Sequence, residues 1–335
     1  MKMGGMETFT NKLKHIPQIW LAMAALAAQQ GPIIRVPVRL INVPTLVFSK
    51  EGRLVPDLQA TDFRVYDNGD LQKIALDTMA TSVSVVLAVQ VNQDVREYVP
   101  FIKKAGSVVE ALLVGDSGEA AVITYGDDIT VVKPFGSGDV QSALSKISTG
   151  GRGARAIDAG HRAITLLKER SAARDRILLF IGQPIDNGSE VTLSFLREQA
   201  ERENVSIHTL TLPEFGKAFV SDTFSLQGLP REAGGFKAGV DLGKLIAVLN
   251  RSNAMEKGAD PFTVLTAATG GTQLHFRKQK ELENGIAAIG VELRSAYLLR
   301  YSPRSTETGY HAIKVEVNVV GATVHARPGY WWGAN

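Results

Sequence analysis

The pattern of hydrophobic and polar residues differs between the middle of this chain and its two ends. In the middle of the chain, four apolar runs have the length and composition of strands buried on both faces: Val83–Val89, Ala120–Tyr125, Ile177–Ile181 and Val205–Leu212. Apolar residues recur with helical spacing at Val99–Leu113, Val140–Ile147, Ile157–Leu167 and Leu193–Glu203. Strands that alternate with helices predict an α/β fold with a doubly wound, mainly parallel sheet covered on both faces.

Both ends of the chain show the shorter period of β structure. Polar and apolar residues alternate in the N-terminal segment 33–79, where Asn68-Gly69 is a strong hairpin signal. The C-terminal segment 294–332 contains three further strand-like runs. Because the ends of a domain commonly lie close in space, we expect the two segments to form one small β-sheet or sandwich.

The α/β region spans residues 80–293 and is interrupted once. Segment 214–260 combines glycine-rich sequence with one helical stretch near 242–250 and breaks the order of strands and helices. We therefore interpret it as an insertion into the α/β domain.

The first 27 residues are similar to a secretory signal peptide. Lys12 and Lys14 form a basic region, Ile16–Ala28 is apolar, and Ala25–Ala27 has the small-x-small pattern of a cleavage site. The apolar stretch is shorter than the roughly 20 residues that a membrane-spanning helix needs. We expect the protein to be exported, to the periplasm or outside the cell.

Composition limits the classes of partner. The 335 residues carry a formal net charge of +3 and no cysteine. Lys2, Lys12 and Lys14 against Glu7 place +2 of that charge in the first 27 residues, so the rest of the chain is nearly neutral. A nearly neutral domain gives no sign of nucleic-acid or membrane-surface binding. A chain of this size also buries an adequate core without disulfides.

The segment Ser84–Asp94 is the most informative in the chain. Its apolar run ends in a polar turn that carries Gln90, Asn92 and Asp94. In open α/β sheets, ligands meet the protein at the carboxyl ends of the strands. These three polar residues therefore stand where a binding site is expected.

Several segments together resemble the bacterial VWFA-related domain family of the Acidobacterial type. They follow one another in this order: Leu54–Ile74, Ser84–Asp94, Gly115–Phe135, Arg176–Ser189, Leu265–Gly271 and Leu293–Trp331. The resemblance implies a von Willebrand factor A fold, which is Rossmann-like, with flanking β elements. It also implies a metal-ion-dependent adhesion site, where D-x-S-x-S, a threonine and an aspartate from three loops hold Mg²⁺ or Mn²⁺.

Position by position, the chain departs from that metal-binding pattern. D-x-S-x-S becomes Gln90-x-Asn92-x-Asp94, the threonine falls on Ala154, and the aspartate falls on Gln183. Mg²⁺ sheds water reluctantly and is usually held through carboxylates, which are mostly missing here. Arg152 and Arg155 add positive charge nearby. We therefore expect a degenerate adhesion site, no metal and no cofactor.

The other candidate motifs have simpler structural explanations. Asp186 could supply a substitute ligand but lies in a polar loop, and Asp127-Asp128 is typical of a turn between strands. Gly150–Gly153 lacks the lysine–hydroxyl pair of a phosphate loop. The six histidines show no metal-ligand spacing, and no nucleophile–base pair is visible. We expect no catalytic residue and no enzymatic activity.

The sequence thus predicts an exported, non-enzymatic module that binds a protein partner and no small-molecule substrate. Its predicted binding surface, called the loop face below, carries Gln90, Asn92, Asp94, Arg152, Ala154, Arg155 and Gln183. We expect direct contact through the amides and the two arginines. Two alternatives remain open: an adhesion module that binds Mg²⁺, Mn²⁺ or Ca²⁺ through an atypical ligand shell, and a structural scaffold in the cell envelope.

Overall fold

The computed structural model describes residues 40–77, 82–212, 260–305 and 307–333. The expected signal peptide, 1–27, lies outside these residues, and so does the expected insertion, 214–260, except for Asp260. Both therefore stay predictions. Among the described residues, no helix is long and apolar enough to cross a membrane.

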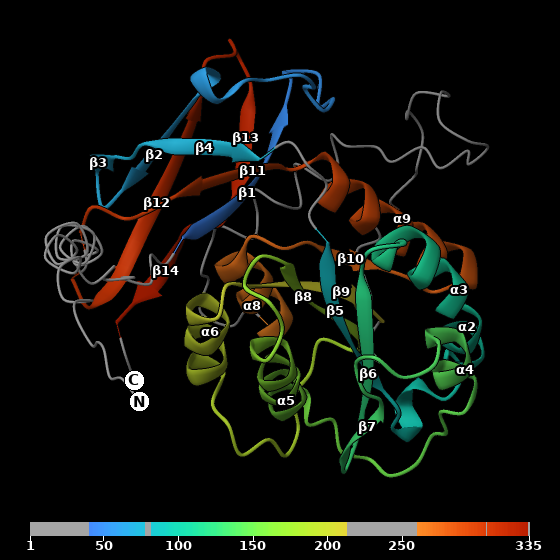
Figure 1. The fold of residues 1–335 in the computed structure, drawn as a ribbon. Coiled ribbons are helices and arrows are strands. Elements are labelled where there is room, and N and C mark those ends of the chain that lie inside the picture. Colours follow the sequence, from blue (N-terminus) through green and yellow to red (C-terminus); the bar gives the residue numbers. More distant parts are fainter. Residues whose placement is uncertain (1–39, 78–81, 213–259, 306, 334–335) are drawn as a thin grey trace, which may run out of the picture. The chain divides into compact units, whose positions relative to one another are not determined.

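A six-stranded sheet forms the centre of the α/β region (Figure 1). Its strands are, in spatial order, β10 (Gln273–His275), β9 (Val205–Thr211), β8 (Asp175–Gly182), β5 (Val83–Gln90), β6 (Glu119–Tyr125) and β7 (Ile129–Lys133). All neighbours pair in parallel except β6 and β7. This is the doubly wound order, in which the chain starts at β5, moves outward to β7, and returns to β8 on the other side. The predicted fold class is confirmed.

Helices cover both faces of this sheet (Figure 1). On one side lie α5 (Ala156–Lys168), α6 (Leu193–Arg202) and α8 (Pro261–Thr269). On the other lie α2 (Val99–Lys104), α3 (Gly106–Val109), η3 (Glu110–Val114), α4 (Val140–Ser145) and α9 (Gln279–Ser295). Successive residues of β5 point into opposite cores, and this is why its sequence is apolar without alternation.

The helix expected over Val99–Leu113 is in fact broken into α2, α3 and the π-helical turn η3. The break lies at Ala105–Gly106. A Cβ at Gly106 would come within 2.4 Å of the Gln141 backbone, so α4 packs where a side chain would otherwise stand. Such a contact depends on a helix more than thirty residues later, which helical periodicity does not reveal.

The two chain ends build two four-stranded sheets. One has the order β13 (Thr323–Ala326), β1 (Ile41–Phe48), β11 (Tyr297–Tyr301), β4 (Ile74–Asp77), and the other the order β14 (Gly329–Trp332), β12 (Gly309–Val317), β2 (Phe63–Asp67), β3 (Asp70–Leu71). Each sheet therefore mixes strands from both ends. One apolar core joins Val43 and Leu299 of the first sheet with Val65 and Ile313 of the second, which confirms the expected sandwich.

The turn between β2 and β3 follows the hairpin signal. Asn68 and Gly69 have φ angles of +49° and +91°, as a two-residue hairpin turn requires. The pairs Tyr66–Leu71 and Asp67–Asp70 set the register on either side of the turn.

The last strand of the sandwich is fastened to α6. The Arg202 guanidinium lies 5.2 Å from the ring centroid of Trp331 and donates to the carbonyl oxygen of Gly333 at 3.1 Å. Arg327 donates to the carbonyl oxygen of Glu201 at 3.2 Å. The C-terminal strand is thus held to the α/β region by cation–π and hydrogen-bond contacts.

Candidate functional site

The candidate site lies where the chain leaves β5 and β8. β5 ends at Gln90, and β8 ends at Gly182, directly before Gln183. The two strands pair in parallel, so their carboxyl ends share one edge of the sheet. They are also the neighbours at which the strand order reverses, where doubly wound sheets bind ligands. The loop face therefore occupies the ligand-binding position of the fold.

The side-chain amide of Gln90 joins the two strand ends. Its Oε1 accepts a hydrogen bond from the Gln183 backbone N–H, with 2.6 Å between the heavy atoms. A backbone N–H can only donate, so this contact fixes which end of the amide is oxygen. Nε2 donates to Oδ1 of Asn92 at 3.0 Å and to Oε1 of Gln183 at 3.2 Å. The three side chains are at most 3% exposed, and hydrogen bonds among these residues satisfy their buried polar groups.

Asn92 carries this network toward the surface. Its Nδ2 donates to Oδ2 of the exposed Asp94 at 3.3 Å and to the Arg152 carbonyl oxygen at 3.5 Å. Backbone bonds run beside it, from Gln93 N–H to the Gly151 oxygen and from Gly150 N–H to the Val91 oxygen. The loop after β5 is thus attached to the loop before α5.

The inner wall of the site is uncharged. A Cβ at Gly182 would lie 2.4 Å from the Tyr125 hydroxyl and 2.7 Å from Oε1 of Gln90, so only glycine fits. Burial, and then the negative charge of Asp186, raise the pKa of the Tyr125 hydroxyl above its ordinary value. Among the described residues this hydroxyl has no hydrogen-bond partner. The base of the site is therefore formed by amides and a neutral phenol.

Asp127 organises the glycine-rich loop before α5. Its Oδ1 accepts hydrogen bonds from the backbone N–H groups of Arg152 and Gly153, at 3.2 and 2.6 Å. Gly151 has φ +69°, and a Cβ there would overlap the Asp127 carboxylate. The backbone donors that a phosphate would need are thus already taken by the chain's own carboxylate.

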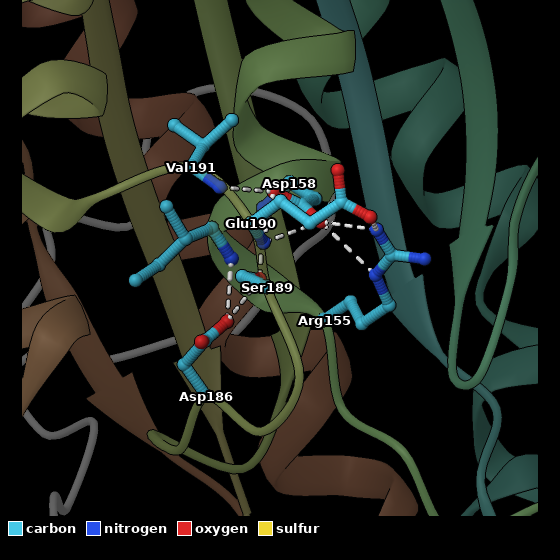
Figure 2. Close-up of polar contacts among 7 residues, drawn as sticks. Arg155, Asp158, Asp186, Ser189, Glu190 and Val191 are labelled. Atoms are coloured by element: carbon cyan, nitrogen blue, oxygen red, sulfur yellow. Dashed lines mark hydrogen bonds and ion pairs between the residues drawn. The ribbon is translucent and has the colours of Figure 1, made fainter.

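Asp186 fastens the loop after β8 to the start of α5, as Figure 2 shows. Its Oδ1 accepts from the Ile157 backbone N–H at 2.8 Å and from the Ser189 hydroxyl at 2.6 Å. Ala154 and Asn187 form an isolated antiparallel bridge beside it. Asp186 was considered as a substitute metal ligand, but its Oδ1 already accepts hydrogen bonds from the first turn of α5 and from Ser189.

Arg155 is paired with carboxylates (Figure 2). Its Nη2 lies 2.6 Å from Oδ2 of Asp158 and 3.3 Å from Oε1 of Glu190. Burial alone would raise the pKa of Asp158, but hydrogen bonds from the Val191 and Glu190 N–H groups and the Arg155 guanidinium outweigh it and lower that pKa. The positive repulsion expected from Arg155 is therefore offset by Asp158.

The structure brings the seven predicted site residues to one edge of the sheet but gives them different roles. Gln90, Asn92, Ala154 and Gln183 are buried, Asp94 and Arg152 are exposed, and the side chain of Arg155 is 28% exposed. Sequence reasoning missed Asp127 and Asp158 as loop organisers. Asp158 could have been found, since it follows Arg155 by three residues on a helix, a spacing typical of ion pairs.

The residues present do not fit the divalent cation that the family resemblance implies. Each amide oxygen of the network already accepts a hydrogen bond, and the carboxylate that contacts the network is that of Asp94. Mg²⁺ and Ca²⁺ need several oxygen ligands, with carboxylates among them. Among the described residues, no group of three or more His, Asp or Glu could hold a metal ion.

No family model matches the chain, and no curated protein matches it. Solved structures resemble it at low identity. A von Willebrand factor type A protein from Catenulispora acidiphila covers 89% of this chain and 75% of its own, with 9% identity and a TM-score of 0.46. An aerotolerance-related membrane protein from Bacteroides fragilis covers 63% and 98%, with 14% identity and a TM-score of 0.38. BatB from Bacteroides thetaiotaomicron covers 62% and 99%, with 12% identity and a TM-score of 0.37. The fold assignment itself rests on the order and pairing of the central strands.

Proposed function

We propose that this chain is an exported, non-enzymatic module that binds a protein partner through its loop face without a bridging cation. The observation that carries the proposal is the placement of two exposed charges, Asp94 and Arg152, on loops tied together at the switch point of the sheet. Preorganised charged groups on a rigid rim favour specific recognition of a complementary surface.

The loop face contains buried residues that hold the loops and exposed charged residues that can contact a partner, and this arrangement supports direct binding. The buried amides of Gln90, Asn92 and Gln183 are out of a partner's reach and act by holding the loops in place. Recognition then falls to the exposed Asp94 and Arg152 and to the edge of the ion pair between Arg155 and Glu190. The expectation that the amides themselves touch the partner is therefore wrong, because these side chains are at most 3% exposed.

The test is affinity capture from the native cell envelope, comparing the wild-type chain with the double variant Asp94→Ala/Arg152→Ala. We expect partners recovered by the wild type to be lost with the variant, and recovery to be unchanged by EDTA. The matched control is Lys314→Ala/Glu316→Ala, which removes an exposed ion pair of 2.8 Å from β12. Equal losses with both double variants, or loss with EDTA alone, would contradict the proposal.

Export is tested separately. A tagged full-length chain and one that lacks residues 1–27 are compared by cell fractionation. We expect the full-length chain outside the cytoplasm, shortened at about residue 27, and the truncated chain inside. A full-length chain retained inside the cell would remove the exported part of the proposal.

A further inference from the structure

The amide nitrogen of Gln90 stands at the point where oxygens from two loops converge. Oδ1 of Asn92 comes from the loop after β5, and Oε1 of Gln183 from the loop after β8. Both point at the same atom, Gln90 Nε2, at 3.0 and 3.2 Å. We infer that the Gln90 side-chain NH₂ is a built-in substitute for a bound cation, which holds the loop face together without metal.

The stoichiometry of the hydrogen bonds supports this role. A primary amide has two N–H donors, and at Gln90 Nε2 two acceptors use them. Oε1 of Gln90 is engaged by the Gln183 N–H, so the opposite end of the amide is also satisfied. The group is completely buried. A buried polar network of this kind is stable when every member is paired, and no further ligand is then required.

The charge balance favours an amide over an ion. The two converging oxygens are neutral carbonyls, and the carboxylate of Asp94 contacts the network through Nδ2 of Asn92. An ion at this position would be buried with little opposing charge, which is costly. The partial positive charge of an NH₂ group attracts the same oxygens without that cost. The inference concerns the same loops as the proposed function but does not depend on a partner binding there.

A near-isosteric substitution makes the inference testable. Gln90→Glu keeps the shape of the side chain and replaces the NH₂ by a carboxylate oxygen, which then faces Oδ1 of Asn92 and Oε1 of Gln183. Without metal, three oxygens converge and repel one another. With Mg²⁺, Mn²⁺ or Ca²⁺, the same three oxygens form the beginning of a ligand shell. The stability of this variant should therefore depend on a cation that has no effect on the stability of the wild type.

The measurement is the thermal midpoint of the full chain at neutral pH, first in EDTA and then with each cation at millimolar concentration. We expect the wild type to be unchanged by cations. Q90E should unfold about 5–10 °C lower in EDTA, because buried pairing is lost and like groups face one another, and each effective cation should recover at least half of that loss. Isothermal titration calorimetry should detect binding to Q90E and none to the wild type.

Gln72→Glu is the matched control. Gln72 is also buried, at 6% exposed, and among the described residues its Nε2 donates to one acceptor, the Asp70 carbonyl oxygen, at 2.9 Å. Q72E introduces the same charge without converging oxygens, so its midpoint should fall without recovery by cations. Recovery of Q72E equal to that of Q90E would overturn the inference, because the cation would then be acting on charge in general.

Two further outcomes would overturn it. One is a wild-type midpoint that rises with a cation, since the native residues would then bind it themselves. The other comes from Gln90→Met, which removes both ends of the amide at similar volume and keeps the test usable if Q90E does not fold. We expect Q90M to lose several degrees without any response to cations. A Q90M variant as stable as the wild type would show that the amide does not hold the loops.

Discussion

Two buried polar clusters lie in different parts of this molecule, and they differ in whether they contain ionisable side chains. At the end of the α/β sheet, Gln90, Asn92 and Gln183 form a cluster of neutral amides. In the β-sandwich, Asp67 and His311 form a buried acid–base pair with 2.8 Å between Oδ1 and Nδ1. The three buried side chains at the strand ends are thus neutral, whereas the sandwich buries a carboxylate.

The Asp67 cluster connects the two sheets of the sandwich. Oδ2 of Asp67 accepts from the Tyr330 hydroxyl at 2.6 Å and from the Tyr301 hydroxyl at 3.0 Å. Tyr301 belongs to the sheet of β1, while the other members belong to the sheet of β12. Nε2 of His311 faces the Glu307 carbonyl oxygen at 2.8 Å. Because every polar atom of the carboxylate is used inside the protein, this cluster has a structural role.

The largest effect is expected from Asp67→Ala, which tests whether the charged cluster is structural. The substitution leaves His311 and two tyrosine hydroxyls buried without their shared acceptor, so unfolding should become easier by about 3–5 kcal/mol. Urea unfolding measures this. Asp70→Ala, on the exposed strand of the same hairpin, should change stability by less than about 0.5 kcal/mol. A loss below about 1 kcal/mol for D67A would remove the contrast between the two clusters.

Glu292 offers a third way of burying an acid and predicts a pH dependence. Burial raises the pKa of Glu292 from 4.5 to about 7, while a 2.6 Å hydrogen bond from the Thr272 hydroxyl opposes the rise. The folded chain therefore keeps a proton that the unfolded chain loses. This stabilising contribution is complete below pH 4.5, falls as the pH rises, and is lost above about pH 7.

The measurement compares Glu292→Gln with the wild type by urea unfolding between pH 5 and pH 8. Two and a half pK units correspond to about 3 kcal/mol, so the wild type should lose up to roughly that much stability relative to E292Q across this range. Taking the difference cancels the titration of groups common to both chains, such as His208. Parallel pH profiles for the two proteins would show that Glu292 does not keep a proton in the folded chain.

Asp158→Asn tests whether the Asp158 carboxylate holds the loop after β8, which lies beside the cluster of neutral amides. The change removes the charge that pairs with Arg155 and weakens the acceptor of the Glu190 and Val191 N–H groups, so we expect a loss of about 2 kcal/mol. Hydrogen exchange should accelerate at those two amides while exchange in β5 stays slow. Asp116→Asn, at an exposed turn, is the control. Unchanged exchange at both amides would contradict a role for Asp158 in holding the loop.

Much of the fold could be predicted from the sequence because it depends on local patterns. Apolar runs marked four of the six strands of the central sheet, and Asn68-Gly69 marked a hairpin turn in which both residues have positive φ angles. The site could be located but not described. Gln90 was placed correctly at a strand end, yet its burial depends on Gln183, ninety-three residues away. The break at Gly106 likewise depends on Gln141, a contact outside the range of any periodic pattern.

The smallest stability effect is expected from Asp94→Ala, and its value lies in the comparison with Asn92→Ala. Asp94 is exposed and accepts one 3.3 Å bond, so its removal should change the unfolding free energy by less than about 0.5 kcal/mol. Asn92 is completely buried and bonded to Gln90, so N92A should cost about 2 kcal/mol. Urea unfolding of both variants shows whether the buried Asn92 supports the loops while the exposed Asp94 contributes little to stability. In that case Asp94 is available for recognition of a partner. If D94A costs as much as N92A, the carboxylate belongs to the supporting interior, and recognition must rest on Arg152 and the ion pair beside it.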